Sequence, residues 1–424
     1  MLEKILRTTE RFIPKPLYHA GQPIYHFLLA FFGALLYRFP SKKIFVVGVT
    51  GTKGKTSTVE LVNTILEEAG YKTALSGTLR VKTGDVSRRN LLKMTTPGRF
   101  FIQKFLRSAV KSGCDYAIIE MTSEGTKQFR HKFLDLDALI FTNLSPEHIE
   151  SHGSYEKYVE AKLKIAKALE RSKKKEKWII VNGDDKEAGK FLKTDVAHKI
   201  IYSLADAYPF HTSERESSFT FEGEKITARL PGEFNIHNML AAAAFAKTQG
   251  IDTATMKSAL ERFPGIPGRL EYVDEGQDFS VIVDYAHTPD SLEKVYETFG
   301  ESKKICVLGA AGGGRDTWKR KEMGRIAKRH CFTIILTDED PYDEDPKRIV
   351  DNIAEGIGRS AHTTILDRKE AIREALRTAG KGDAVLITGK GTDPYIMGPR
   401  GSKMPWSDAD VVREKLRTLL KKKQ

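Results

Sequence analysis

From residue 43 onward, short apolar runs rich in β-branched residues alternate with longer stretches of helical periodicity. The runs that have the length and composition of buried strands are Lys43–Val49, Tyr116–Glu120, Ala138–Thr142 and Trp178–Val181. Helical spacing of apolar residues marks Ser57–Ala69 and Arg99–Lys111 between them. Strands that alternate with helices predict an α/β fold, with a mostly parallel sheet covered on both faces.

The pattern changes near residue 217 and later returns. Ser217–Leu230 alternates around a Gly turn and predicts a hairpin, and the alanine-rich Asn238–Gln249 predicts a helix. Phe263–Arg269 (FPGIPGR) has the breaks of an interdomain linker. Beyond the linker, strands are predicted at Val281–Asp284, Ile305–Gly309, Thr333–Thr337 and Ala384–Thr388. We therefore predict an apolar helical arm at residues 1–41, a central domain at 42–267, and a C-terminal Rossmann-like α/β domain at 268–424.

The arm contains Tyr25–Tyr37 (YHFLLAFFGALLY), which is strongly apolar but shorter than the roughly 20 residues that span a bilayer. Basic residues precede it and a small-residue cleavage site is missing, so the pattern does not favour a signal peptide. It indicates either a helix docked on the body of the protein or a helix in a membrane interface.

The composition is that of an ordinary globular protein, with 424 residues, 40% hydrophobic and 29% charged. The cysteines Cys114, Cys306 and Cys331 lie far apart in apolar runs. This argues against a disulfide framework and a structural zinc site, and favours a reducing, cytoplasmic compartment with the cysteines as buried packing residues. The net charge of +13 indicates anionic ligands or surfaces, but no motif for nucleic acid is present.

The strongest local signal is Gly48–Ser57 (GVTGTKGKTS), which lies between a predicted strand and a predicted helix. Its glycines let backbone amides turn toward a phosphate, and the helix N-terminus adds partial positive charge. Lys55 would reach the outer phosphates and Thr56 could ligate magnesium. The glycine spacing differs from a standard P-loop, and the alternative is a Gly-rich turn without function. We predict that the central domain is a P-loop-type ATPase domain.

A second signal lies on the helix predicted near residues 154–170. Its apolar stripe is formed by Tyr155, Tyr158, Val159, Leu163 and Ala166, and Lys162 lies on the same stripe. A buried lysine amine is costly unless it is paired or neutral, and burial lowers its pKa. The alternative is a lysine whose ammonium reaches solvent.

Together these segments resemble the Mur ligases and the related folylpolyglutamate synthetases, and most closely the UDP-N-acetylmuramoyl-tripeptide synthetase branch. The matching motifs, in order, are TGTKGKTS at Thr50–Ser57, TTP at Thr95–Pro97, Glu120, FTNLSPEHIESHG at Phe141–Gly153, YVEAK at Tyr158–Lys162, GEFNIHN at Gly232–Asn238, GRLE at Gly268–Glu271, DYAHTPD at Asp284–Asp290 and TGKG at Thr388–Gly391. In that branch a separate UDP-sugar domain precedes the ATP loop, and here only residues 1–41 do. The expected grip on a nucleotide sugar is therefore reduced, replaced or aimed at another acceptor.

The resemblance implies roles for individual residues. ATP is expected at Gly51, Thr52, Gly54, Lys55, Thr56 and Ser57, with Asn238 at the adenine, Arg269 at the phosphates, Asp284 at the ribose and His287 near the base. Two Mg²⁺ ions are expected at Thr56, Glu120, His148 and Lys162, where Lys162 carries a carbamate formed with CO2. Lys55, Glu120, His148 and Lys162 are the expected catalytic group. Without the resemblance, His148 and His152 would be assigned to a surface loop.

The expected substrate contacts are Thr95 and Thr96 in the central domain and Asp340, Tyr342 and Asp393 in the last domain. The acidic run Asp338–Pro346 (DEDPYDEDP) follows a predicted strand, where the family binds its amino acid. Diaminopimelate-adding members have Asn and Arg where this chain has Asp340 and Tyr342. Thr392 and Asp393 replace His and Glu. We therefore expect a basic amino acid such as lysine or ornithine, although a solvated acidic loop is the alternative.

The expected activity is ATP-dependent ligation of an amino acid, through an acyl phosphate, to the carboxylate of a muramoyl-peptide precursor of peptidoglycan. The alternatives are a folylpolyglutamate or poly-amino-acid ligase and a non-catalytic ATP-binding subunit. The expected partners are small molecules, with a peripheral membrane contact through the arm.

Overall fold

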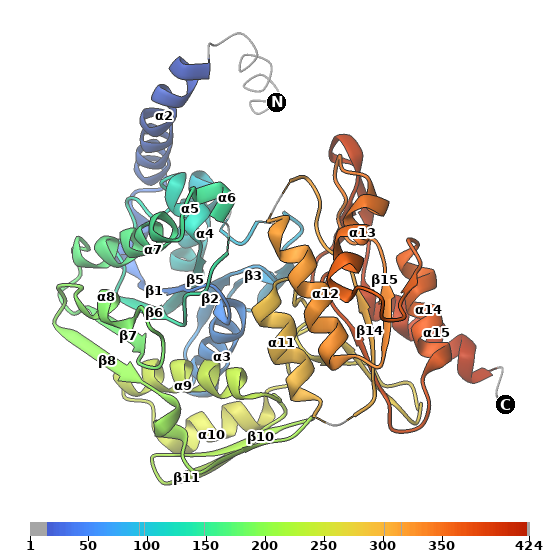
Figure 1. Cartoon of the computed structure of the whole chain (residues 1–424). Coiled ribbons are helices and arrows are strands. Elements are labelled where there is room, and N and C mark those ends of the chain that lie inside the picture. The colour runs from blue at the N-terminus through green and yellow to red at the C-terminus, as the bar shows by residue number, and fades with distance from the viewer. Residues whose placement is uncertain are drawn as a thin grey trace. The chain divides into compact units, whose positions relative to one another are not determined.

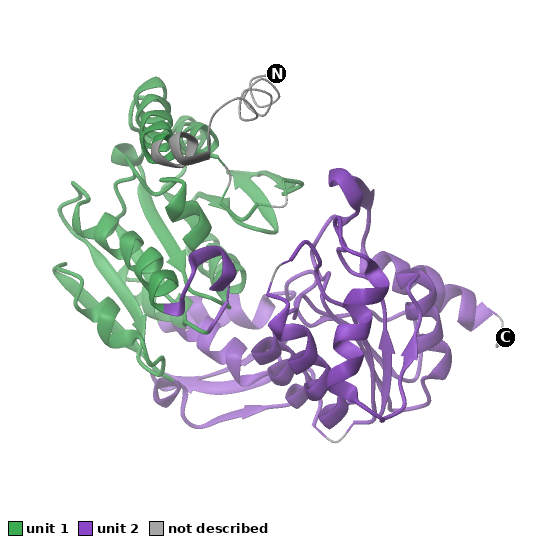
Figure 2. Cartoon of the chain, turned by 45° about the horizontal axis from the view of Figure 1, so that its top comes forward, with its two compact units in different colours: residues 1–145, 156–203, 241–252 green, residues 146–155, 204–240, 253–424 purple. Residues whose placement is uncertain are grey.

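A computed structural model describes residues 15–92, 94–96, 98–147, 149–300, 302–314 and 316–421 of the chain. The chain divides into two compact units, shown in separate colours in Figure 2. Unit 1 contains residues 1–145, 156–203 and 241–252, and unit 2 contains residues 146–155, 204–240 and 253–424. The three domains predicted from the sequence are continuous segments with boundaries at residues 42 and 268, whereas the two units are defined by contacts and are discontinuous in sequence. The three-domain division stays a prediction.

The centre of unit 1 is an eight-stranded sheet with the order β4-β3-β2-β5-β1-β6-β7-β8. Its strands are β1 (Phe45–Thr50), β2 (Thr73–Ser76), β3 (Arg80–Thr83), β4 (Val86–Arg89), β5 (Tyr116–Met121), β6 (Ala138–Phe141), β7 (Trp178–Asn182) and β8 (His198–Tyr202). Neighbours from β2 to β8 pair in parallel, and β3 and β4 add an antiparallel edge. The predicted mostly parallel sheet is confirmed, but the sequence pattern did not predict the polar edge strands.

Helices of the first half of the chain precede or connect these strands (Figure 1). They are η1 (Pro40–Lys43), α3 (Lys55–Glu68), α4 (Arg99–Lys111), α5 (Ser123–Lys127), α6 (Ile149–His152), α7 (Tyr155–Glu170) and α8 (Ala188–Leu192). The predicted helix Arg99–Lys111 has the observed bounds of α4. On α7 the predicted stripe is buried at Tyr158, Val159 and Ala166, whereas Tyr155 and Leu163 are only partly covered.

The middle of the chain forms a small antiparallel sheet and a helical layer. Its elements are η2 (Leu204–Ala207), β9 (Phe210–Thr212), β10 (Ser217–Phe221), β11 (Glu224–Ala228), α9 (Glu233–Thr248) and α10 (Thr253–Arg262). The hairpin predicted within Ser217–Leu230 is β10–β11, paired antiparallel from Ser217↔Ala228 to Phe221↔Glu224.

The last domain is built on a six-stranded sheet of order β12-β13-β17-β14-β15-β16, in which only β12 is antiparallel. Its strands and the nearby hairpin are β12 (Glu271–Tyr272), β13 (Ser280–Val283), β14 (Lys304–Leu308), β15 (Thr333–Leu336), β16 (Thr363–Thr364), β17 (Ala384–Ile387), β18 (Tyr395–Met397) and β19 (Lys403–Pro405). Its helices are α11 (Pro289–Thr298), α12 (Trp318–His330), α13 (Pro346–Ile357), α14 (Arg368–Thr378), η3 (Pro399–Gly401) and α15 (Asp408–Lys421).

Alternate residues of these strands point to opposite faces, and each face has its own apolar core. Cys306 and Leu308 of β14 belong to the core under α11, α12 and α13, whereas Ile305 and Val307 belong to the core under α14 and α15. A parallel sheet covered on both faces is the predicted Rossmann-like arrangement.

Helices α12 and α13 pack with their backbones in close approach. A Cβ atom added at Gly324 would lie 2.0 Å from the carbonyl oxygen of Ile353, and one added at Gly356 would lie 1.9 Å from that of Lys321. Both positions therefore require glycine for packing.

The cysteines require a correction. Cys306 and Cys331 form a disulfide with an Sγ–Sγ distance of 2.00 Å, whereas the sequence argued against disulfides. The reason is topological: β14 and β15 are parallel neighbours, so Cys306 on one strand lies beside the residue that leads into the other. The buried positions predicted for Cys114 and Cys306 are confirmed.

The N-terminal segment Tyr25–Tyr37 falls almost entirely in α2 (Lys15–Leu36), which packs on α4. Ala30 and Ala34 are buried in this contact, and the rings of Phe27 and Phe31 lie 5.3 and 5.5 Å from that of Phe133. The predicted docked helix is thus confirmed for one face of α2. No helix within the described part of the chain is long and apolar enough to cross a membrane.

Candidate active site

The Gly-rich loop joins β1 to α3 at the carboxyl edge of the sheet of unit 1. Gly54 precedes the first residue of α3 with φ 80°, a left-handed conformation that glycine adopts without strain. At Gly51 the limit is space, because an added Cβ would lie 1.9 Å from the hydroxyl of Thr142. The loop therefore leads directly into the N-terminus of α3, whose partial positive charge favours an anion.

The segment after β6 holds this loop in shape. The Thr142 hydroxyl donates to the carbonyl oxygen of Lys53 at 2.7 Å, and the Asn143 side chain accepts from the Lys53 amide at 2.9 Å. The Thr52 amide donates to the Asn143 carbonyl oxygen at 2.8 Å. The sequence did not single out Thr142 or Asn143, although they lie in the FTNL motif directly after a predicted strand.

Glu120 lies beside the loop with its side chain buried. Its carboxylate accepts from the Thr56 hydroxyl at 3.2 Å, and from the amide and hydroxyl of Thr78 at 2.9 and 3.0 Å. Glu120 is 2% exposed and Thr56 is 6% exposed. β1 and β5 are parallel neighbours, so their carboxyl ends bring these two residues together. Thr78 was not predicted as a member of this group.

The two threonines of the TTP motif join the same network. The hydroxyl oxygens of Thr95 and Thr78 lie 2.8 Å apart, and the Thr96 hydroxyl donates to the carbonyl oxygen of Glu120 at 2.9 Å. The structure thus brings the predicted substrate contacts Thr95 and Thr96 next to the predicted metal ligand Glu120.

Lys162 of α7 is buried, at 2% exposure, so its ammonium does not reach solvent as the alternative required. Its Nζ donates to the carbonyl oxygen of Gly51 at 2.5 Å and lies 5.5 Å from the centre of the Tyr158 ring. The Tyr158 hydroxyl is 2.8 Å from the Thr52 hydroxyl. Two residues of the buried stripe of α7 therefore contact the Gly-rich loop.

The other residues of the loop are also placed. The Lys55 ammonium folds back and donates to the carbonyl oxygen of Thr52 at 2.8 Å, and Ser57 is buried in the first turn of α3. His148, the remaining predicted metal ligand, lies outside the described residues.

The nucleotide contacts predicted in unit 2 lie in two places. Asn238 is buried in α9, where its amide donates to the side chain of Asn235 at 3.2 Å. Asp284 directly follows β13 and accepts from the amides of Leu270 and Ala286 at 2.7 and 2.6 Å, so its carboxylate is already satisfied by the backbone.

Arg269 and His287 both contact Tyr285, the residue after Asp284. The guanidinium of Arg269 lies 4.3 Å from the centre of the Tyr285 ring, and its buried Nε has no hydrogen-bond partner among the residues that the structure describes. His287 Nε2 is 3.3 Å from the carboxylate of Glu147, and Nδ1 is 2.8 Å from the carbonyl oxygen of Tyr285.

Most carboxylates of the acidic run have partners within unit 2. Asp340 accepts from the fully buried Lys390 ammonium at 2.8 Å and from the Met397 amide at 2.8 Å, and Asp393 is 3.3 Å from the same ammonium. Glu344 pairs with the buried Arg320 at 2.6 Å. The first part of the run is therefore buried and paired, whereas Asp343 and Asp345 are exposed, as the solvated-loop alternative expects.

Glu339 is the exception. It is 4% exposed, and its Oε2 has no hydrogen-bond partner within the described part of the chain. Burial, followed by repulsion from Asp340, raises the pKa of Glu339 to about 7. This carboxyl group is therefore largely protonated in mildly acidic solution.

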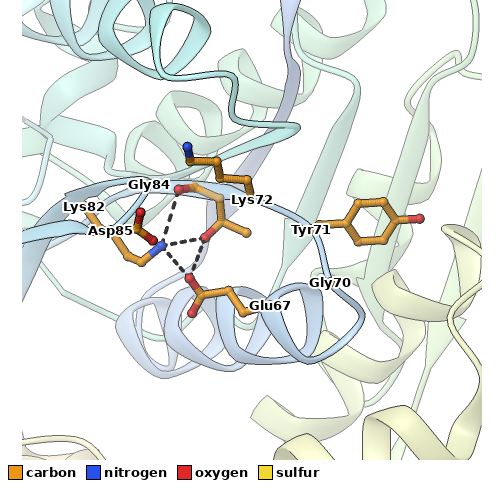
Figure 3. A pocket seen from close by; sticks show the side chains of 8 residues that line it. Glu67, Gly70, Tyr71, Lys72, Lys82, Gly84 and Asp85 are labelled. Atoms are coloured by element: carbon orange, nitrogen blue, oxygen red, sulfur yellow. Dashed lines mark hydrogen bonds and ion pairs between the residues drawn. The ribbon is translucent and has the colours of Figure 1, made fainter.

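Two cavities of unit 1 lie at the opposite, amino ends of the strands. One of about 420 Å³ is lined by residues around the start of β2 (Figure 3). Its Lys82 ammonium is held by the Glu67 carboxylate at 2.5 Å and the Thr73 hydroxyl at 2.9 Å. The second, of about 500 Å³, is lined by residues from Lys42 to Lys174. The network in Figure 3 is internally satisfied, so it is a structural cluster rather than a second reaction centre.

Comparison with known proteins adds to this geometry. Residues 49–246 match the Mur ligase middle domain, and residues 268–391 match the Mur ligase glutamate ligase domain. A relative from Syntrophomonas wolfei, a UDP-N-acetylmuramoyl-L-alanyl-D-glutamate–2,6-diaminopimelate ligase, is 38% identical over 408 residues, which cover 93% of this chain and 82% of the relative. The ligase of the same name from Bacillus licheniformis is 37% identical over 399 residues, covering 91% and 81%.

Solved structures agree on the fold. A diaminopimelate ligase of the same name superposes with a TM-score of 0.60 at 28% identity, covering 89% of this chain and 79% of that one. The folylpolyglutamate synthase of Mycobacterium tuberculosis in complex with ADP reaches a TM-score of 0.69 at 14% identity, covering 92% and 94%. The second likeness concerns the fold alone.

Proposed function

This chain belongs to the Mur ligase family, and from that premise we propose that it joins a diamino acid to the free carboxylate of a muramoyl-peptide precursor of peptidoglycan. The enzyme is an ATP-dependent acid–amino-acid ligase that releases ADP and phosphate. The observation that carries the proposal is the Gly-rich loop with the buried Glu120–Thr56 contact at its side.

The loop would bind the phosphates of ATP. The amides at the start of α3 and the partial positive charge of its N-terminus favour an anion there. Lys55 now donates to Thr52, within the loop itself, so its ammonium would exchange this carbonyl oxygen for a phosphate oxygen when ATP binds. Thr142 and Asn143 would keep the loop in the shape that phosphate requires.

Magnesium fits the donors of this site, because Mg²⁺ prefers oxygen ligands and the buried Glu120 and Thr56 supply a carboxylate and a hydroxyl. We propose that these residues, with His148 and a carbamate on Lys162, hold two ions. When bound, the ions neutralise the charge that develops on the transferred phosphoryl group. The carbamate would turn a cation beside the phosphate loop into an anion that can hold metal.

The proposed reaction has two steps. An oxygen of the acceptor carboxylate attacks the γ-phosphorus of ATP, and the bond to the bridging oxygen breaks to give an acyl phosphate and ADP. The neutral amine of the incoming amino acid then attacks the acyl carbon, phosphate leaves with the C–O bond electrons, and the nitrogen loses a proton to give the amide. Thr95 and Thr96, beside Glu120, would position the acceptor at the first step.

The amino acid is proposed to bind in the last domain, around Asp340, Tyr342 and Asp393. The relatives named above use 2,6-diaminopimelate, which is a diamino acid. Since Asp340 and Asp393 share the Lys390 ammonium, the charge that they offer a ligand is smaller than the sequence suggested. For α2 we also propose a peripheral contact with a membrane surface.

The test is ADP release by the purified chain with a panel of acceptors and amino acids. UDP-linked and sugar-only muramoyl dipeptides, folate and short glutamyl peptides would each be paired with diaminopimelate, lysine, ornithine and glutamate. We expect turnover only with a muramoyl dipeptide and a diamino acid. Turnover with folate and glutamate, or ATP binding without turnover on any acceptor, would overturn the proposal.

A further inference from the structure

Helix α2 uses only one of its faces for packing. Ala30 and Ala34 are buried against the body of unit 1, and the opposite arc of the helix presents large apolar side chains to solvent. These exposed residues are Ile24, Tyr25, Leu28, Phe32, Leu35 and Leu36, each between 40% and 66% exposed. Figure 1 shows α2 at the outer edge of unit 1. A contiguous apolar arc of this kind marks an interaction surface rather than an ordinary solvated helix.

Helix α2 lies on elements that carry positive charge and no carboxylate of their own. Helix α2, the η1 turn and helix α4 contain no Asp or Glu. The cations on or beside these elements are Arg38, Lys42, Lys43, Arg99, Lys104, Arg107 and Lys111. Within the described residues, neither Arg99 nor Arg130, which lies close to it, forms an ion pair.

The segment under α2 extends this positive region. On α2 itself, burial and then the charges of Arg99 and Arg130 lower the pKa of His26 to about 4, so its ring is neutral at pH 7 and the positive charge belongs to the two arginines. The pKa of Lys132, next to the Phe133 ring that α2 covers, is lowered by burial and then by Arg171 and Lys164. Cations therefore gather at this end of unit 1, and a partner for it should be anionic.

We infer that the exposed arc of α2 is a docking surface for an anionic lipid membrane, on which the helix lies parallel to the surface. Apolar side chains enter the boundary between headgroups and acyl chains, while the surrounding cations attract anionic headgroups. This surface lies outside the ligase site and does not depend on the proposed reaction.

Charge favours a membrane over a second copy of the chain. If two copies met through this arc, the cations of α2, η1 and α4 in one copy would lie within about one Debye length of those in the other, roughly 10 Å at 0.1 M salt. The two copies would therefore repel each other. An anionic bilayer supplies both the apolar layer and the opposite charge.

The test uses the full chain in flotation assays with vesicles of phosphatidylcholine alone, or of phosphatidylcholine with one-third phosphatidylglycerol. The double variant Phe32→Ser/Leu36→Ser removes two residues that are 53% and 66% exposed. The matched control is Ile201→Ser/Phe332→Ser, at positions 56% and 72% exposed outside α2. A thermal shift with ATP checks that each variant is folded, and ADP release on a soluble acceptor is measured in parallel.

We expect the wild type and the control to bind the anionic vesicles, more weakly at high salt, and the α2 variant to bind at least about tenfold less. ATP binding and turnover should be unchanged in all three proteins. The inference is overturned if the wild type binds neither kind of vesicle, if the control loses binding equally, or if α2 mediates self-association instead. Each of these results leaves the ligase proposal standing, because that proposal is tested by turnover alone.

Discussion

The side chain of Lys162 would have a different role in each of two chemical states, the ammonium and the carbamate. As an ammonium it stabilises the Gly-rich loop through the carbonyl oxygen of Gly51. As a carbamate, formed from the neutral amine and CO2 with release of a proton, it would be a metal ligand. Both roles need the buried position that the structure shows, so position alone does not separate them.

The two roles predict different behaviour of Lys162→Arg. A guanidinium can still donate to the Gly51 carbonyl oxygen but does not carry the carbamate, so we expect a loss of turnover on the order of 100-fold or more, with ATP binding retained. Wild-type turnover should fall when CO2 is stripped and return with bicarbonate. ¹³C-labelled bicarbonate should give a carbamate signal in NMR spectra of the wild type only. An arginine variant with full activity would exclude the carbamate.

Alanine substitutions at Glu120 and Lys55 should reduce activity for different reasons. Glu120→Ala removes the carboxylate that faces Thr56 and Thr78, so we expect a higher Mg²⁺ requirement and turnover reduced about 100-fold at ordinary Mg²⁺. Lys55→Ala should instead weaken ATP binding, measured by calorimetry, at every Mg²⁺ concentration. Normal turnover of Glu120→Ala at ordinary Mg²⁺ would show that the metal assignment is wrong.

Glu339 predicts a pH dependence of stability. Its carboxyl pKa is raised to about 7 in the folded protein, above the ordinary value of 4.5. Between these values the unfolded chain has lost the proton and the folded chain has kept it, so stability falls as pH rises from about 4.5 to 7 and then levels off. The loss is about 3 kcal/mol at most.

The variant Glu339→Gln cannot ionise and should not show this loss. Urea unfolding of both proteins from pH 5 to pH 8 would measure it: the free energy of unfolding of the wild type, relative to the variant, should decrease with rising pH. A difference that stays constant across this range would contradict the raised pKa.

Secondary-structure elements place these residues, and the loop between β1 and α3 is the most constrained of the connections. Gly51→Ala should displace the loop, since the added Cβ would overlap the Thr142 hydroxyl, and we expect ATP binding to fall at least tenfold. Gly70→Ala is the matched control: φ is +86° and no atom lies within 4 Å of the added Cβ. It should cost about 1 kcal/mol of stability and leave ATP binding intact. Equal ATP affinity of the two variants would contradict the steric argument.

The elements that apolar periodicity could predict are those with a buried face. Helix α4 and strands β5, β6 and β7 lie within a residue or two of their predicted bounds. The edge strands β3 and β4 carry the sequences RVKT and VSRR, which have no apolar alternation, and only their pairing with β2 makes them strands. Apolar periodicity arises from burial, so it does not identify edge strands whose side chains are polar or exposed.

The candidate site likewise contains features that the sequence could predict and contacts that it could not. The Gly-rich loop and the buried Lys162 follow from local spacing, and both are where the sequence placed them. The contacts of Thr78 with Glu120 and of Asn143 with Lys53 join residues that are 42 and 90 positions apart. The Lys390 ammonium between Asp340 and Asp393 is likewise a product of the fold. Such partners need the topology of the sheet before they can be predicted.

At the scale of the whole molecule, we predict that the charges of residues 268–424 determine which amino acid is joined. The run is acidic, and Tyr342 stands where diaminopimelate-adding members have an arginine. We therefore still predict that lysine or ornithine outcompetes glutamate and diaminopimelate. Asp393→Asn should raise the KM for the amino acid at least about tenfold with little change in melting temperature. Asp340→Asn, which also loses the bond from the Met397 amide, should lower the melting temperature. A preference for diaminopimelate in direct competition would contradict this prediction.

The glycine contact between α12 and α13 determines how a library of random substitutions would behave under selection for activity. Any side chain at Gly324 or Gly356 would push the two backbones apart, so both positions should be intolerant although neither belongs to the site. Such a screen would rank them with Lys55 and Glu120. Melting temperatures of the purified variants would separate the two classes. Variants at the helix glycines should lose activity because they unfold, whereas variants at the site residues should lose activity while still folded.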